Sequence, residues 1–318
     1  MKRICLFDPA LEDNRGTISS NLGDLIIQEA VLNELRELFH LDDIFSISTH
    51  HKLGLKESVR ALFSDFSFIG GSNLLSSRMD EYHQWRISLL DIPKLRNVIL
   101  MGVGWWQYQE KPNMYTAFLL RQVLSNNYVH SVRDQYTLEM LKRIGIHNVY
   151  NTGCPTMWRF SNYLPVPCKK AENVLTTLTD YNKDQEFDLC LLKNLQLHYN
   201  KVYFWPQGRC DKEYVQSLGF PVHMLEHNLE SYYSFLKSGI DFDYVGTRLH
   251  GGIYCLANGK RSLIIAIDNR AREISSDSNI PVVERGNIDA ILGWILHPTP
   301  TQIILPRRKI DQWKAQFS

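Results

Sequence analysis

Short apolar runs alternate with segments of helical periodicity along almost the whole chain. Apolar residues recur about every 3.6 positions in Asp24–Phe39 and in Asp134–Ile144, and Gly145 follows the second segment as a typical helix stop. The apolar runs between such segments have the residue types of buried strands. In the first half of the chain we predict strands at Ile4–Phe7, Ile44–Ile47, Phe66–Ile69, Val98–Gly102, Tyr128–Val132 and Val149–Asn151.

A proline-containing stretch separates this pattern from a second one. Tyr163–Lys170 contains two prolines and a lysine pair without helical periodicity, which is typical of a linker. After it we predict strands at Val174–Leu178, Lys201–Trp205, Val222–Leu225, Phe242–Val245 and Leu263–Ile267. We predict helices at Gln185–Leu197, Glu213–Leu218, Leu229–Lys237, His250–Ala257 and Asn287–Leu296.

This alternation predicts an α/β protein with mostly parallel sheets and helices on both faces. We expect two doubly wound, Rossmann-like domains facing a central cleft, with small molecules bound at the carboxyl ends of the strands. The expected division is an N-terminal domain at 1–163, a linker at 164–170, a C-terminal domain at 171–300 and a tail or helix at 301–318. Packing of that last segment back onto the N-terminal domain is one option.

Composition excludes several classes of protein. The 318 residues include 35 Lys and Arg against 34 Asp and Glu, a formal charge of +1, and 44% are hydrophobic. Such a chain is too apolar to be disordered and too balanced in charge for a general nucleic-acid binder.

The sequence predicts neither a membrane span nor an export signal. The longest apolar run, near Leu263–Ile267, is far shorter than the ~20 residues of a spanning helix. Asp8 and Pro9 end the first apolar run too early for a signal peptide. The six cysteines are scattered, without CxxC or zinc-type spacing, so we expect reduced thiols and a cytoplasmic protein.

Three residues at the entry to the first long helix are candidates for binding. Asn21, Gly23 and Asp24 follow the first predicted strand, where ligands often bind in α/β folds. Gly23 allows an unusual backbone angle or the close approach of a ligand. Asp24 is either the N-cap of the helix or a ligand-binding side chain, and the sequence leaves both open.

Two predicted strands end in glycine-rich exits. Gly70 and Gly71 are followed by Asn73, and Gly102 and Gly104 repeat the arrangement after the next strand. Adjacent glycines let backbone N–H groups point at a ligand oxygen, although a plain tight turn explains each exit equally well. Neither exit matches a P-loop or the GxGxxG pattern, but together they predict a lined cleft.

Two arginines and a histidine are the sharpest candidates for chemistry. Arg133 lies where a strand becomes a helix, and Arg248 and His250 lie two apart in a glycine-rich turn before a helix. An arginine fork binds carboxylate or phosphate, and a helix N-terminus favours the same anions. His250 has the pKa range for proton transfer, whereas a local arrangement with Asp134 at the protein surface is the alternative for Arg133. No motif indicates a catalytic metal.

The order of these motifs resembles the polysaccharide pyruvyl transferase family over roughly residues 16 to 275. The resemblance implies a two-domain fold similar to glycosyltransferase B. It implies transfer of the pyruvate group of phosphoenolpyruvate to two hydroxyls of a sugar, as a ketal, in surface or exopolysaccharide synthesis without a cofactor. The matching residues are Asn21, Gly23, Asp24, Gly70, Gly71, Leu74, Leu75, Gly102, Gly104, Val132, Arg133, Asp134, Arg248, Leu249, His250 and Gly251.

The resemblance also assigns roles to single residues. Arg133 and Arg248 would hold the carboxylate and phosphate of phosphoenolpyruvate, and His250 would be the general acid. Leu249 would shape the pocket through its backbone, Gly251 would be a further substrate-binding residue, and the sugar would bind near Asp24 and the loop at 70–73. A lipid-linked acceptor would bring the enzyme to the inner face of the membrane, while nucleic acid is not an expected partner. Positive charge should therefore be concentrated around one small anion.

Two alternatives stay open at this point. A nucleotide-sugar-dependent glycosyltransferase of the same fold could use Asp24 as its base, and a non-catalytic member of the family would only bind an anion. One departure from the family pattern is Gly153-Cys-Pro155, which stands where an Asp-Pro pair is usual and removes any carboxylate role there.

Overall fold

The computed structural model describes residues 2–39, 43–95, 97–160 and 165–317. The chain forms two compact units. Unit 1 comprises Met1–Ser19, Asp24–Arg159 and Leu305–Ser318, and unit 2 comprises Ser20–Gly23 and Phe160–Ile304. The predicted domain boundary at residue 163 and the first residue of the predicted linker, residue 164, lie outside the described residues.

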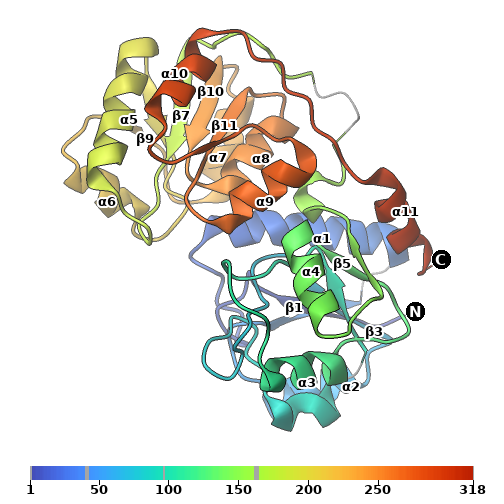
Figure 1. The fold of residues 1–318 in the computed structure, drawn as a ribbon. Helices are drawn as coiled ribbons and strands as arrows, with labels where there is room; N and C mark the ends of the chain where they lie inside the picture. Colours follow the sequence, from blue (N-terminus) through green and yellow to red (C-terminus); the bar gives the residue numbers. More distant parts are fainter. Residues whose placement is uncertain (1, 40–42, 96, 161–164, 318) are drawn as a thin grey trace. The chain divides into compact units, whose positions relative to one another are not determined.

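Parallel strands form the centre of unit 1 (Figure 1). One sheet has the order β2-β1-β3-β4, and a two-stranded sheet, β5-β6, adjoins the end of β4. Gly102 N donates to Ser131 O at 3.0 Å and Arg133 N to Val103 O at 3.0 Å, which connects the two sheets. The order reverses between β1 and β3, as in flavodoxin-like folds. The strands are β1 (Ile4–Asp8), β2 (Ile44–Ser48), β3 (Phe66–Gly70), β4 (Val98–Met101), β5 (His130–Val132) and β6 (Val149–Asn151).

Helices cover both faces of unit 1. Alternate strand residues point to opposite faces: Leu6 packs with helices α1 and α11, whereas Phe7 packs with α3 and α4. Trp313 of α11 is fully buried in the first of these cores. The helices are α1 (Leu22–Phe39), α2 (Leu55–Leu62), the 3-10 helix η1 (Leu89–Lys94), α3 (Met114–Val123), α4 (Gln135–Arg143), the 3-10 helix η2 (Pro155–Met157) and α11 (Arg307–Ala315).

Unit 2 has the strand order of a dinucleotide-binding Rossmann fold. Its parallel sheet reads β12-β11-β10-β7-β8-β9, so the order reverses between β7 and β10. The strands are β7 (Asn173–Thr177), β8 (Val202–Phe204), β9 (His223–Met224), β10 (Phe242–Gly246), β11 (Ser262–Ala266) and β12 (Val282–Glu284).

Helices also cover both faces of the unit 2 sheet (Figure 1). Helices α5, α6 and α10 pack against Val174, Val245 and Ile265 on one face. Helices α8 and α9 contact β11 on the other face, and α7 joins them through the Tyr232 hydroxyl, which donates to Gly251 O at 2.7 Å. The helices are α5 (Gln185–His198), α6 (Asp211–Ser217), α7 (Leu229–Lys237), α8 (Leu249–Ala257), α9 (Asn269–Ser278) and α10 (Ile288–Leu296).

The predicted fold class is confirmed: the chain is an α/β protein of two Rossmann-like units with parallel sheets and flanking helices. Each predicted strand and helix overlaps an observed one, with ends that differ by at most two residues. Strand β12 and helices α2, α3 and α9 were not predicted from the sequence.

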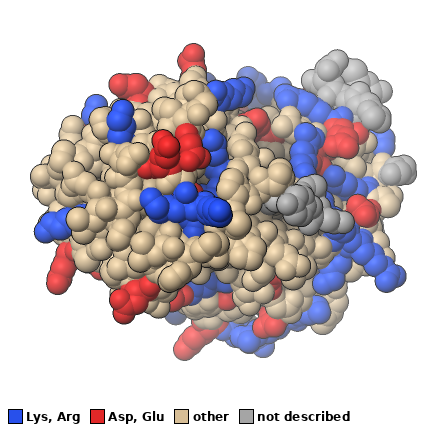
Figure 2. Space-filling view, turned by 90° about the horizontal axis from the view of Figure 1, so that it is seen from above, with Lys and Arg blue, Asp and Glu red and all other residues tan. Residues whose placement is uncertain are grey.

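Charges of both signs share the surface. On the face shown in Figure 2, basic and acidic side chains lie side by side near the middle, as the balanced composition leads one to expect. Among the described residues, no helix has the length and apolar character needed to cross a membrane.

Candidate functional site

The turn after β10 lies at the reversal of strand order in unit 2. Thr247 N donates to Thr177 O at 2.9 Å, and Arg248 N donates to Thr177 Oγ1 at 3.2 Å, so the end of β7 fixes the turn. Helix α8 begins at Leu249, which places His250 in its first turn. Arg248, Leu249 and His250 therefore lie together at the N-terminus of a helix and at the reversal point, the usual ligand position in this fold.

Two carboxylates hold the Arg248 side chain. Its Nε donates to Asp211 Oδ2 at 3.0 Å, and its Nη2 donates to Asp211 Oδ1 and, at 3.1 Å, to Asp180 Oδ1. Burial lowers the pKa of the guanidinium, but Asp211, Tyr181 and Asp180 outweigh it and raise the pKa above its ordinary value. The buried arginine is therefore protonated. The local surplus of positive charge expected from the sequence is wrong here, because two carboxylates face one guanidinium.

One nitrogen of the Arg248 guanidinium takes no part in these contacts. Its Nη1 makes no hydrogen bond to any residue that the structure describes, whereas Nε and Nη2 are both engaged. The Tyr181 ring centre lies 4.9 Å from Arg248 Cζ, and the Tyr181 hydroxyl accepts from Arg270 Nη2 at 2.6 Å. A tyrosine thus links two arginines at the carboxyl edge of the sheet, and Arg270 is itself paired with Asp268.

Gln207 connects the predicted residues Asn21 and Gly23 to this site. Its Nε2 donates to Asn21 Oδ1 at 3.2 Å, and its backbone O accepts from Leu22 N at 2.9 Å. A Cβ atom on Gly251 would lie 3.2 Å from Gln207 Oε1, so this side chain also borders the first turn of α8. Gln207 is buried, and its Oε1 accepts no hydrogen bond from the described part of the chain. It can accept one from a ligand.

The capping option for Asp24 is wrong. Helix α1 begins at Leu22, and Asn21 caps it by accepting a hydrogen bond from Gly23 N at 3.2 Å. Asp24 lies within the first turn, where its Oδ2 accepts from Ser19 Oγ at 3.1 Å. A ligand-binding role for Asp24 stays a prediction.

A second buried arginine lies at the carboxyl edge of unit 1. Arg133 follows β5, its Nη2 donates to Asn73 Oδ1, and its Nε lies 3.5 Å from Asp134 Oδ2. Gly104 leaves the space that the guanidinium occupies, because any Cβ at this position would clash with it. The surface alternative for this pair is wrong, since both side chains are buried. Arg133 Nη1 is buried and has no hydrogen-bond partner among the described residues.

The N–H groups in the glycine-rich exits of unit 1 donate hydrogen bonds to backbone carbonyl oxygens. Gly71 N donates to Met101 O at 2.8 Å, Gly102 N to Ser131 O at 3.0 Å and Gly104 N to Ser72 O at 2.8 Å. The expectation that these N–H groups point at a ligand oxygen is therefore wrong. A Cβ on Gly70 would lie 2.8 Å from Val31 Cγ1, so this glycine allows α1 to approach β3. Ligand contacts of these residues other than through these N–H groups stay predictions.

The Cys154 thiol is packed inside unit 1. It accepts from Thr156 Oγ1 at 3.0 Å, and burial raises its pKa, which keeps the thiol protonated and unreactive. In the described ranges, no three His, Cys, Asp or Glu side chains are grouped closely enough to hold a metal ion.

Sequence reasoning missed the residues that hold Arg248 in place. Asp180 comes from the loop after β7 and Gln207 from the loop after β8, and Asp211 is the first residue of helix α6, which follows that second loop. A signal was present, because the carboxyl ends of parallel strands meet at one edge of a sheet and polar residues just after them converge there. The sequence alone did not show which of the many polar loop residues reach the arginine.

The strand order of unit 2, with a buried Arg–Asp pair at its reversal point, defines a Rossmann-like α/β protein suited to an anionic ligand. The sequence model of the polysaccharide pyruvyl transferase family matches residues 21–269. The chain belongs to this family, which confirms the resemblance, and it is a transferase with a pyruvyl-transfer role in polysaccharide synthesis. A search of curated proteins found no match.

Proposed function

We propose that the protein transfers the pyruvate group of phosphoenolpyruvate to two hydroxyls of one sugar and releases phosphate. The observation that supports this most is the Arg248 guanidinium, which is buried, protonated, fixed by Asp211 and unpaired at Nη1 toward the described residues. Phosphoenolpyruvate carries a carboxylate and a phosphate, the two groups that an arginine and a helix N-terminus bind best.

The reaction needs an acid and no redox partner. We assign the acid to His250, which in its protonated form would give a proton to the methylene carbon, leaving a positive charge on the neighbouring carbon, where the ester oxygen stabilises it. A sugar hydroxyl attacks this neighbouring carbon and loses its proton, and phosphate departs with the electrons of the broken C–O bond. The second hydroxyl attacks the resulting oxocarbenium ion and loses a proton, which closes the ketal and restores the proton balance.

Arg133 is proposed as a second cationic contact for the donor, on the basis of its buried and unpaired Nη1. The sugar would contact the residues near Asp24 and the loop at 70–73. The six cysteines form no disulfide, which supports the proposal that the protein works in the reducing cytoplasm.

The test is phosphate release from phosphoenolpyruvate across a panel of sugar and lipid-linked acceptors, with mass spectrometry of the acceptor. We expect a product heavier by one pyruvate minus water, since both hydroxyls are consumed. His250→Gln should lose turnover, because glutamine cannot donate the proton. Arg248→Lys should lose most of it, because lysine cannot keep the paired contact with Asp211.

Two variants serve as matched controls in unit 2. His297 is exposed, and Arg272 forms an exposed pair with Glu284, so His297→Gln and Arg272→Gln should retain full turnover. Transfer of a glycosyl group from a nucleotide sugar, with no phosphate release from phosphoenolpyruvate on any acceptor, would contradict the proposal.

A further inference from the structure

Exposed large apolar side chains are concentrated on one part of unit 1. Leu55 on α2 is 84% exposed, Leu90 on η1 is 82% exposed and Met114 on α3 is 88% exposed. We use the term apolar ridge for the exposed apolar residues of these three elements and of the residue after α2. They are Leu55, Val59, Leu62, Phe63, Leu89, Leu90, Met114 and Phe118.

Helix α2 is turned opposite to the usual orientation of a surface helix. Leu55, Val59 and Leu62 follow the i, i+4, i+7 spacing that places side chains on one stripe, and all three are exposed. The buried positions of the helix are the small residues Ser58 and Ala61. The large apolar residues of α2 therefore do not contribute to the core, and the helix presents its apolar side to its surroundings.

The elements that carry the ridge contact one another, and cations lie beside the apolar stripe of α2. Helix α2 contacts η1, and η1 contacts α3. Helices α2 and α3 are labelled in the lower part of Figure 1. Lys56 and Arg60 lie on α2 beside the apolar stripe, and both are exposed. The acidic residues of these elements are Glu57, which is half-buried, and Asp91, which pairs with Lys94 at 3.3 Å.

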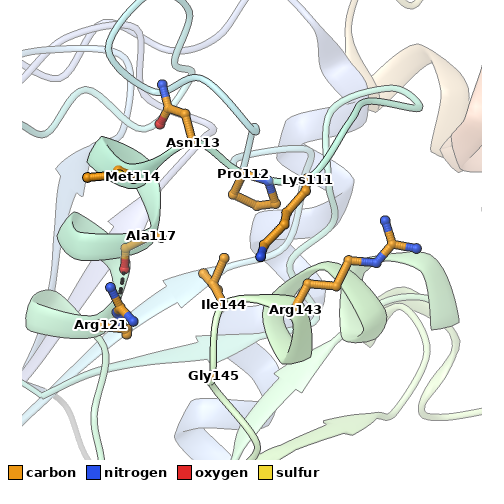
Figure 3. Close-up of a pocket in the computed structure, with 9 residues that line it drawn as sticks. All are labelled: Lys111, Pro112, Asn113, Met114, Ala117, Arg121, Arg143, Ile144 and Gly145. Atoms are coloured by element: carbon orange, nitrogen blue, oxygen red, sulfur yellow. Dashed lines mark hydrogen bonds between the residues drawn. The ribbon is translucent and has the colours of Figure 1, made fainter.

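A cationic pocket adjoins the ridge. Its cavity of about 520 Å³ lies between α3 and the end of α4, and Met114 belongs to both the pocket and the ridge. Three of the lining residues are Lys111, Arg121 and Arg143, and none is acidic. Figure 3 shows the Lys111 side chain extending toward the space between α3 and the end of α4.

We propose that this face docks unit 1 on a membrane surface that contains anionic lipids. The ridge would enter the interface between headgroups and acyl chains, while the cations beside the stripe and the pocket would bind lipid phosphates. The apolar stripe matches the acyl-chain side of such an interface. The cations beside the stripe and in the pocket are the charge complement of its lipid phosphates. The inference is independent of the proposed reaction, because vesicle binding is measured without substrate.

The test is flotation of the full-length protein with vesicles of phosphatidylcholine alone or with phosphatidylglycerol added. We expect binding only to the anionic vesicles, and weaker binding at high salt. Leu55→Ser with Leu90→Ser should abolish binding. Lys111→Glu with Arg121→Glu should weaken it by at least about fivefold per cation removed, since each cation near such a surface contributes ~1 kcal/mol.

The controls make the same changes on unit 2. Leu197 and Leu296 are exposed apolar residues, and Lys193 and Lys237 are exposed cations. Leu197→Ser with Leu296→Ser and Lys193→Glu with Lys237→Glu should bind as the wild type does, with circular dichroism confirming that every variant is folded. Equal binding by ridge and control variants would overturn the proposal. So would a lack of vesicle binding combined with self-association that the ridge variants abolish, which would assign the face to a second copy of the chain.

Discussion

At the scale of single residues, the two carboxylates that hold Arg248 differ in their exposure. The Asp211 side chain is fully buried and also accepts backbone N–H groups from Gln207 and Gly208, at 3.1 and 2.6 Å. The Asp180 side chain is 25% exposed and contacts only one end of the guanidinium. Asp211 therefore sets the position of the arginine, whereas Asp180 chiefly reduces the local positive charge.

Replacing each aspartate by asparagine should separate these two effects. Asp211→Asn leaves a buried cation without its main partner, so the free energy of unfolding should fall by about 3–5 kcal/mol. Asp180→Asn removes one negative charge near the bound anion, so the KM for phosphoenolpyruvate should fall about fivefold, for a repulsion on the order of 1 kcal/mol. Urea unfolding and steady-state kinetics measure the two quantities. A higher KM in Asp180→Asn would show that this carboxylate orients the arginine for binding.

The sequence identified the arginines but not their surroundings. Arg248 was recognisable because a glycine-rich turn between a strand and a helix is a local pattern. Its partners Asp180 and Asp211 are 68 and 37 residues away, and only the folded sheet brings them together. The sequence likewise could not show that the N–H groups of Gly71 and Gly102 are used by neighbouring strands.

At the scale of elements, the predictions failed where local pattern and burial disagree. Helix α2 has large apolar residues on its exposed side and Ser58 and Ala61 on its buried side, so a core-facing stripe could not reveal it. Strand β12 (Val282–Glu284) is short and lies at the edge of its sheet, which leaves little periodicity to detect. The long helices and central strands were predictable because their burial follows the simple periods.

Strand β5 contains a histidine whose titration should affect stability. His130 is fully buried, Leu100 N donates to its Nδ1 at 3.2 Å, and its Nε2 lies 2.9 Å from Ser125 O, so the neutral ring fits with the proton on Nε2. Burial lowers its pKa to about 4, below the ordinary 6.5. Between pH 4 and pH 6.5 the unfolded chain therefore binds the proton more readily than the folded chain does. The contribution of neutral His130 to the free energy of unfolding is complete above pH 6.5 and is lost as the pH falls toward 4, a change of about 3 kcal/mol.

His130→Gln is the variant that isolates this effect, because glutamine keeps a donor for Ser125 O and does not titrate. Urea unfolding from pH 7 to pH 4 should show a steeper loss of stability for the wild type than for the variant. Buried carboxylates with raised pKa values, such as Asp8 and Asp243, act in the opposite direction, but they are common to both proteins. Parallel pH profiles of the wild type and the variant would show that the pKa of His130 is not lowered in the folded protein.

At the scale of the whole molecule, chain order and spatial units do not coincide. The C-terminal helix α11 belongs to unit 1, where the buried Trp313 ring packs against Phe68 and Trp158. Residues 20–23 belong to unit 2, where Gln207 contacts them. A division of the sequence into consecutive stretches could not represent either feature, because each depends on contacts between residues far apart in the chain.

Donor binding should stabilise the folded protein as a whole. A ligand that binds only the folded chain adds about 2.7 kcal/mol at a concentration one hundred times its Kd, so phosphoenolpyruvate should raise the Tm. Arg248→Gln should remove the rise, because it deletes the cation at the reversal point of unit 2, whereas Arg272→Gln should keep it. Differential scanning calorimetry measures the shift, and hydrogen exchange over residues 246–257 locates it. A Tm raised by nucleotide sugars and not by phosphoenolpyruvate would favour a glycosyl donor, even though the anion site itself would then be real.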